Sequence, residues 1–417
     1  MLIVFLYFSE FIVLLGAPLN QDYRYKIFLV VTFAMVFSLY LMIFLLKGAG
    51  KFSYTSLFVI LFGLLGFLIG ILNGWYIKDI VGDSLRFLSP FLAYFLGKNL
   101  FKKLTLDQIK STFMIILKVL LYMLLLDLLY RVFSIIILGE PIVKYPDGGV
   151  KVPVIVISFF LFSWYYTPTK RNVLFSFFII LLLTLFIISP VMSGSKTTFL
   201  SVVFTLLFTS FVFGQYRHKL WTIVFFIFGA FLVVYNQSSI LIIDRLMNAI
   251  EMVFSADSAD MDIDLSTYAR AIELRSILDS LLDYGFYPLS FLIGTGSGSL
   301  WYSSIDVGAG LNVENFRPDG GAHHVHTELA SLVFRHGLIG LSMYLVWIFY
   351  VARKSYLVFK YYFRHDMFVA SMSAAIVVQL YSVVIVMFSG TSIYGHFFVG
   401  LISAIPVVLY NRRHIKT

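Results

Sequence analysis

Long apolar runs recur along this 417-residue sequence, and they decide what the chain can fold into. A run of about 17 to 25 mostly apolar residues has the length of a helix that crosses the hydrocarbon core of a bilayer. Only 13% of the residues are charged, whereas soluble domains contain about 25%. Because a chain in lipid must satisfy its backbone polar groups internally, the sequence predicts an all-α polytopic membrane protein.

About twelve spans are expected from these runs. They cover roughly 2–19, 27–46, 54–72, 84–101, 112–139, 152–168, 172–190, 197–214, 220–238, 327–351, 367–388 and 394–410. Spans one to nine would occupy 1–238, a large extracytoplasmic loop 239–326, and spans ten to twelve 327–417. The first run lacks the basic start and cleavage site of a signal peptide, so it is expected to remain as a membrane helix.

The charges of the loops predict the orientation of the chain. One alternate set of loops is basic, with only Asp107 and Asp366 as acids. Its cations are Lys47, Lys51, Lys98, Lys102, Lys103, Lys110, Lys170, Arg171, Arg217, Lys219, Arg353, Lys354, Lys360, Arg364, Arg412, Arg413 and Lys416. Basic loops stay in the cytoplasm, so these loops and both termini are expected there. The net charge of +9 is thereby explained without nucleic-acid binding.

The segment between spans nine and ten has the opposite character. It holds twelve acidic residues from Asp244 to Asp319, no lysine, and the arginines Arg245, Arg270, Arg275 and Arg317. Ile240 to Phe254 and Thr267 to Tyr284 carry apolar residues at helical spacing, which predicts amphipathic helices that lie at the membrane surface or cap the bundle. The glycine run from Gly294 to Gly298 is expected to let backbone amides approach a ligand.

Three of the eight histidines, His323, His324 and His326, fall where this external segment re-enters span ten. A histidine at such a junction is reached by water on one side and held by packed helices on the other. Because histidine changes charge near neutral pH, it is suited there to proton transfer. His326 and His324 are therefore candidate catalytic bases, with His323 in a supporting role. If the helix begins near Ala322, Glu328 lies one turn after His324 and orients it.

Two other interpretations of the histidines remain open. They are a metal site, because His-x-His is a common ligand pair, or a polar helix cap without chemistry. The sequence has no cysteine and no His-Glu-x-x-His pattern, and one loop supplies all three histidines, so no metal is expected. The lack of cysteine also excludes a disulfide and a thiolate nucleophile.

Several cations are candidates for binding an anion. Lys196 opens a helix after an external turn, where free amides already favour negative charge, although a snorkelling lysine explains it equally well. Arg270 and Arg275 are suited to clamping phosphate oxygens, unless they form surface pairs with Glu273 or nearby aspartates. Arg86 in span four and Arg335, two turns inside span ten beside His336, are expected to line a polar cavity.

In this order, the motifs resemble those of the O-antigen polymerase and ligase superfamily, the Wzy and O-antigen-ligase-like membrane proteins. Ser193-Gly194-Ser195-Lys196-Thr197 is similar to the family's Ser-x-Ser-Arg-[Ser/Thr] turn. Arg270 heads an external helix that leads to Gly294–Gly298. His326-Thr327-Glu328-Leu329 and Gly337-Leu338-Ile339-Gly340 are similar to the His-Asn-x-x-Leu and Gly-Leu-x-Gly patterns. Lys196 departs from the usual arginine, and Thr327 from the usual asparagine.

The resemblance implies a GT-C-like glycosyltransferase that works without metal, nucleotide or other cofactor. A glycan would move from undecaprenyl diphosphate to an acceptor hydroxyl on the outer face of the cytoplasmic membrane. His326 or His324 would remove the acceptor proton, while Arg270, Lys196 and either Arg86 or Arg275 hold the diphosphate.

The first interpretation is a polymerase of O-antigen, capsule or exopolysaccharide repeat units, with the bilayer and a chain-length regulator as partners. The alternatives are a ligase acting on a lipid A core or a protein, and a flippase or transporter. Paired broken helices at the midplane, typical of many transporters, are not evident in the sequence.

Overall fold

The computed structural model describes residues 54–137, 154–166, 265–283, 288–302, 321–322, 325, 327–387 and 393–414. These residues are predominantly helical, as an all-α protein requires. The spans expected before residue 54 and between 172 and 238 lie outside the described residues. The number of spans therefore stays a prediction.

Seven of the described helices correspond to expected spans. They are α3 (Tyr54–Leu72), α4 (Ile77–Lys102), α5 (Leu106–Ile137), α6 (Val154–Tyr166), α13 (Glu328–Tyr362), α14 (Met367–Met387) and α15 (Ile393–His414). The largest differences in their bounds are at α4, expected from residue 84, and at α13, expected to end at 351. Hydropathy detects only the apolar centre of a helix, whereas both of these helices continue through polar turns.

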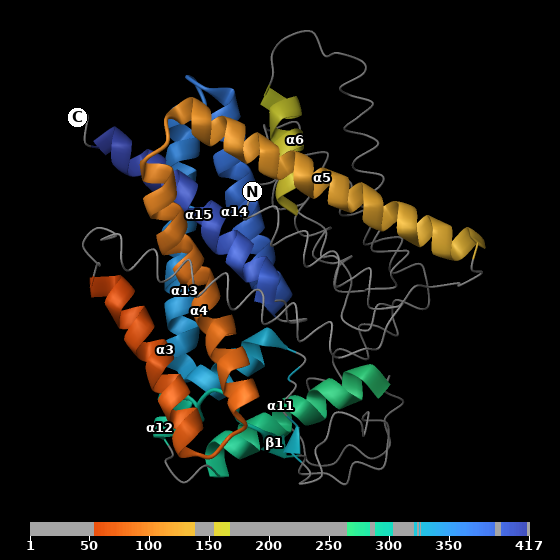
Figure 1. The fold of residues 1–417 in the computed structure, drawn as a ribbon, viewed down its shortest axis with the longest axis vertical. Coiled ribbons are helices and arrows are strands. Elements are labelled where there is room, and N and C mark those ends of the chain that lie inside the picture. The colour runs from red at the N-terminus through yellow and green to blue at the C-terminus, as the bar shows by residue number, and fades with distance from the viewer. Residues whose placement is uncertain are drawn as a thin grey trace, which may run out of the picture.

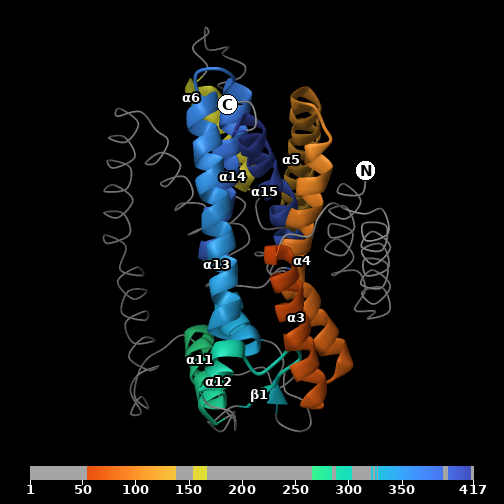
Figure 2. The same cartoon turned by 90° about the vertical axis from the view of Figure 1, so that its left-hand side faces the viewer.

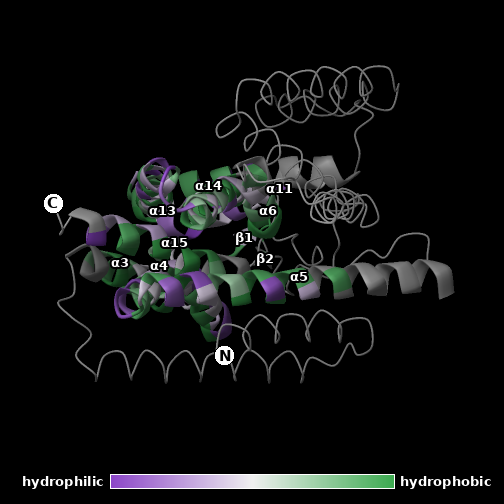
Figure 3. Cartoon of the chain, turned by 90° about the horizontal axis from the view of Figure 1, so that it is seen from above, coloured by the Kyte–Doolittle hydropathy of each residue, from purple (hydrophilic) through white to green (hydrophobic). Residues whose placement is uncertain are grey.

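Within the described ranges, two helices are long and apolar enough to cross a membrane. They are Glu328–Tyr362 and Met367–Val384. Shorter apolar stretches occur at Phe58–Leu72, Val154–Ser163 and Phe398–Arg412. Seen from above, the ribbons of α6 and α14 are mostly coloured as hydrophobic (Figure 3).

The core of the bundle lies between α4, α13, α14 and α15 (Figures 1 and 2). Aromatic rings fill the space between α4 and α13, with Phe91 edge-on to Tyr344 at 5.0 Å between ring centroids and 5.5 Å from Trp347. Aromatic pairs in such arrangements stabilise a core beyond the area they bury. This packing holds α4 and α13 at a fixed separation beyond the first turns of both helices.

The described parts of the segment that was expected to be external lie at the end of the bundle where α13 begins (Figures 1 and 2). They contain α11 (Leu265–Asp283), which confirms the helix expected at 267–284, and the short α12 (Leu289–Ile293). The strands β1 (Trp301–Tyr302) and β2 (Gly321–Ala322) pair antiparallel.

A small second core fixes this segment to α13. Ile277 and Leu281 of α11 are buried with Trp301, Val325 and Phe334. Leu278, although apolar and next to Ile277 in the sequence, is exposed. The apolar stripe of α11 is therefore narrower than its sequence suggests. It is nevertheless sufficient to pack the helix against the first turns of α13.

Basic side chains tie helix ends together at the opposite end of the bundle. Arg412 Nη2 donates to the carbonyl oxygens of Phe101, Lys102 and Leu104, at 2.9, 3.0 and 2.5 Å. These carbonyls belong to the end of α4 and the turn after it, where helical partners are lacking. Lys110 lies 2.5 Å from Asp366 and joins α5 to the turn before α14.

Candidate functional site

A break in α13 shapes the region of interest. Gly337 has φ 65° and ψ −173°, which is not helical, and a side chain at this position would collide with the backbone of Leu292. Glycine adopts positive φ without steric penalty. The Gly337-Leu338-Ile339-Gly340 motif therefore forms a kink in α13 that requires glycine at position 337. On its N-terminal side, the carbonyls of Phe334 and Arg335 accept hydrogen bonds from outside the helix.

Their donors lie in the glycine loop, Gly294–Gly298. Four consecutive amides of this loop, those of Thr295, Gly296, Ser297 and Gly298, donate to Phe334 O, Arg335 O, Gly66 O and Asp83 Oδ2, at 2.8, 3.2, 2.9 and 2.7 Å. The acceptors belong to α13, α3 and α4. The expectation that these amides approach a ligand is wrong, because helices take every one of them. The positive φ angles of its three glycines let the loop pass close to those helices.

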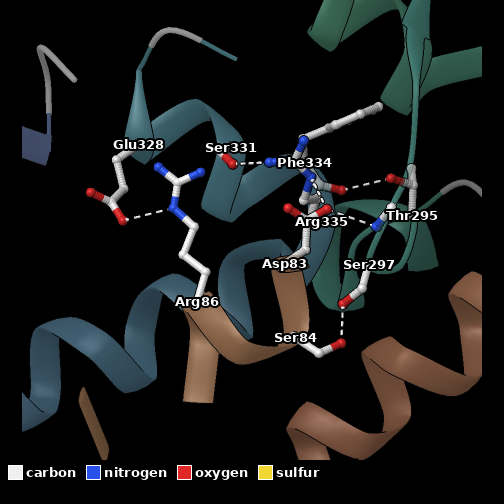
Figure 4. Close-up of polar contacts among 10 residues, drawn as sticks. Asp83, Ser84, Arg86, Thr295, Ser297, Glu328, Ser331, Phe334 and Arg335 are labelled. Carbon is white, nitrogen blue, oxygen red and sulfur yellow. Dashed lines mark hydrogen bonds and ion pairs between the residues drawn. The ribbon is translucent and has the colours of Figure 1, made fainter. Parts of the chain in front are cut away.

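Asp83 of α4 and Arg335 of α13 form an enclosed ion pair beside this loop (Figure 4). Arg335 Nε lies 2.6 Å from Asp83 Oδ2, and the side chains are only 3% and 5% exposed. Arg335 also donates to Ser331 Oγ. Ser84 Oγ donates to Ser297 Oγ at 2.9 Å. Charges in an apolar bundle persist only when paired and hydrogen-bonded, and this pair meets both conditions.

A second and looser pair joins the same two helices. Arg86 Nε lies 3.5 Å from Glu328 Oε1, with the side chains 17% and 8% exposed. Arg86 Nε and Nη2 are buried, and among the described residues neither has a hydrogen-bond partner. The guanidinium is therefore held near a carboxylate while two of its donor atoms remain unused.

Glu328 is the first residue of α13 and Thr327 is its N-cap residue, so the helix begins where span ten was expected, at 327, and not near Ala322. Ala322 pairs with Trp301 in the two-stranded sheet, which keeps the chain extended at that point. The carboxylate of Glu328 faces Arg86, and the position of His324 lies outside the described residues.

The two pairs border a cavity of about 20 Å³, which is room for about one water molecule. It is lined by Asp83, Arg86, Phe87, Glu328, Ser331, Leu332, Arg335, His336 and Tyr344. Arg86 and Arg335 thus share one polar cavity, as their positions in apolar spans predict. The His336 ring stacks on Phe87 at 4.2 Å between centroids, and its Nδ1 has no hydrogen-bond partner in the described part of the chain.

Of the other predicted site residues, only Arg275 has a described side chain away from the cavity. Arg275 does not line the cavity; its Nε lies 4.0 Å from Asp279 Oδ2 on a half-exposed face of α11, which favours the surface-pair interpretation. Arg270 belongs to α11, but its side chain lies outside the described residues, as do Lys196, His323, His324 and His326. The role of the histidines therefore stays a prediction. So does the absence of a metal, although the described residues contain no suitable group of ligands.

The two ion pairs differ in what they can do chemically. Both pairs line the cavity, but Asp83 and Arg335 are in closer contact and also form hydrogen bonds with Gly298 and Ser331. The longer contact of Arg86 with Glu328 leaves Arg86 able to bind an anion through charge-assisted hydrogen bonds. No family model and no curated protein matches the chain.

Proposed function

We propose that the protein is a multi-pass glycosyltransferase of the cytoplasmic membrane. It polymerises undecaprenyl-diphosphate-linked oligosaccharide repeat units into O-antigen, capsule or exopolysaccharide on the outer face. One observation carries the proposal: Arg86 and Glu328 meet beside a polar cavity where α13 begins, directly after the His326-Thr327 sequence. Charged groups within apolar helices are usually retained for function.

The proposed reaction is a displacement at the anomeric carbon of the donor glycan. His326 or His324 removes the proton of the acceptor hydroxyl, and the acceptor oxygen forms the new glycosidic bond. The bond to the diphosphate breaks, and its electron pair leaves with undecaprenyl diphosphate. Arg86, with Lys196 and Arg270, stabilises the charge that develops on the leaving group. Attack from the opposite side inverts the anomeric centre.

The distribution of side chains is consistent with a membrane setting. Phe58, Leu61 and Leu68 on the outer face of α3 are more than half exposed, as expected of a lipid-facing helix. The basic residues Lys102, Lys103 and Arg412 lie at one end of the bundle. The beginnings of α4 and α13, together with α11, lie at the other end (Figure 1). That separation supports a cytoplasmic and an external end.

This orientation can be tested by thiol labelling, because the chain has no cysteine of its own. We expect an impermeant thiol reagent on intact cells, with any outer membrane permeabilised, to label Asp260→Cys and not Lys360→Cys. Asp260 belongs to the segment proposed as external, and Lys360 is exposed near the far end of α13. Labelling of both positions to the same extent would contradict the proposed topology.

The products of a deletion strain test the reaction itself. A polymerase deletion is expected to lose long chains while retaining single repeat units, because initiation and export of the unit do not need it. Long chains left on the lipid carrier would instead identify a ligase. Movement of lipid-linked substrate across liposomes without any change of glycosidic linkage would identify a transporter.

A further inference from the structure

The Arg86–Glu328 contact has features of an exchangeable pair. The neighbouring Asp83–Arg335 pair has a 2.6 Å contact, further hydrogen bonds and almost complete burial. Arg86 Nε and Glu328 Oε1 are 3.5 Å apart, and both Nε and Nη2 of Arg86 are buried without a hydrogen-bond partner among the described residues, whereas in Arg335 only Nε is. A buried guanidinium with unused donors is destabilising by itself. The guanidinium forms more charge-assisted hydrogen bonds when an anion with more oxygen atoms replaces a single distant carboxylate.

We propose that Glu328 competes with a phosphate-bearing ligand for Arg86, and that the ligand displaces the Glu328 carboxylate when it binds. The ligand carries an anionic phosphate or diphosphate group, whose several oxygen atoms match a guanidinium better than one carboxylate oxygen does. The inference rests on the proposed function only where it identifies this ligand as the diphosphate of a lipid-linked glycan.

The start of α13 adds independent support for an anion at this place. Thr327, the N-cap residue, makes no side-chain cap hydrogen bond, and its Oγ1 is buried without a hydrogen-bond partner in the described part of the chain. The first amides of a long helix carry partial positive charge and favour anions. Glu328, the first residue of α13, supplies negative charge to Arg86 and to this helix end alike. A phosphate group can replace the Glu328 carboxylate both at Arg86 and at the start of α13.

The size of the cavity requires the exchange. A space of about 20 Å³ accepts about one water molecule, whereas a phosphate group is several times larger. Glu328 is one of the residues that line this space, so its withdrawal enlarges the cavity next to the donor atoms of Arg86. In sequence Glu328 follows His326 by two residues. Arrival of the donor therefore moves a carboxylate next to the segment that carries the proposed base.

Binding of inorganic pyrophosphate to the purified full-length protein, measured by isothermal titration calorimetry, tests the exchange. Glu328→Gln removes the competing charge but keeps the size of the side chain, so it is expected to bind pyrophosphate about tenfold more tightly than wild type. Arg86→Gln is expected to bind at least about tenfold more weakly, because charge-assisted hydrogen bonds are lost. Asp107→Asn, which removes one exposed carboxylate far from the cavity, is the matched control and is expected to bind like wild type.

Several outcomes would overturn the proposal. They are equal affinity of wild type and Glu328→Gln, tight binding that persists in the Arg86→Gln/Glu328→Gln double variant, or no binding by either protein. Circular dichroism and gel filtration check the fold of each variant. If Arg86→Gln does not fold, Arg86→Lys keeps the charge but not the planar fork, and it must still weaken the binding.

A second titration with farnesyl diphosphate in nanodiscs identifies the source of the anion. A larger gain in affinity of Glu328→Gln for farnesyl diphosphate than for pyrophosphate indicates a lipid headgroup, and an equal gain for both compounds shows that a free anion competes as well. The two proposals can fail separately. Tighter pyrophosphate binding by Glu328→Gln without any glycan polymerisation by the wild type would support the exchange and contradict the proposed reaction. Polymerisation by the wild type with equal pyrophosphate affinity of the two proteins would support the reaction and contradict the exchange.

Discussion

Replacing Asp83 with asparagine is expected to destabilise the protein by about 3–5 kcal/mol, the usual effect of breaking a buried ion pair on one side. Asparagine has almost the same shape, and its side-chain oxygen can still accept the amide hydrogen of Gly298. The variant therefore removes mainly the charge that balances Arg335, whose side chain is 3% exposed. Unfolding in mixed micelles with increasing denaturing detergent measures the loss.

Two further variants make this result decisive. Asp107→Asn removes a charge whose side chain is 93% exposed, and it is expected to unfold like wild type. The double variant Asp83→Leu/Arg335→Met is expected to recover most of the lost stability, because apolar residues of similar volume often replace a buried pair without loss. Equal stability of Asp83→Asn and Asp107→Asn would show that the pair does not hold α4 to α13.

The second large effect is expected in turnover. His326→Ala should reduce the rate of glycan transfer by about 100- to 10,000-fold, the usual contribution of one general base, while the donor still binds. Arg270→Ala should weaken donor binding as well as turnover, because a charge-assisted contact to the diphosphate exists before the reaction and strengthens during it. A reconstituted assay with separate measurements of binding and rate distinguishes the two.

His324→Ala is the control for the identity of the base. A similar loss in this variant, with His326→Ala close to wild type, would move the base by two residues. If all three histidine variants, His323→Ala included, keep normal rate and chain length in folded protein, the histidine cluster is structural and the proposed mechanism is wrong.

The helices could be predicted because their signals are local. Apolar runs identified α3 and α14 almost to the residue, and helical spacing identified α11. The break in α13 was visible only as the glycines of its motif. Its geometry depends on hydrogen bonds between Thr295 and Phe334, which no short window of sequence can reveal. For the same reason the glycine loop was assigned to a ligand instead of to three helices.

The cavity was predictable in part. Arg86 and Arg335 stood out as charges within apolar runs, and the structure places both on one cavity. Asp83 was missed, because a hydropathy boundary at residue 84 left it in a loop although α4 begins at Ile77. The contact of Glu328 with Arg86 was not predicted, because it joins two helices that lie far apart in the sequence.

The reach of the glycine loop has a consequence for the biogenesis of the protein. Asp83 and Gly298 are 215 positions apart, and Ser84 and Ser297 are 213 apart. At about 5–20 residues per second, ribosomes complete the partners of α4 roughly ten to fifty seconds after α4 itself. Throughout that interval Asp83 and Arg86 lack their counterparts on α13. Arrival of that helix and its loop therefore locks the early and late halves of the chain together, and a polypeptide truncated before Arg335 would display unmatched charges to the membrane's quality-control proteases.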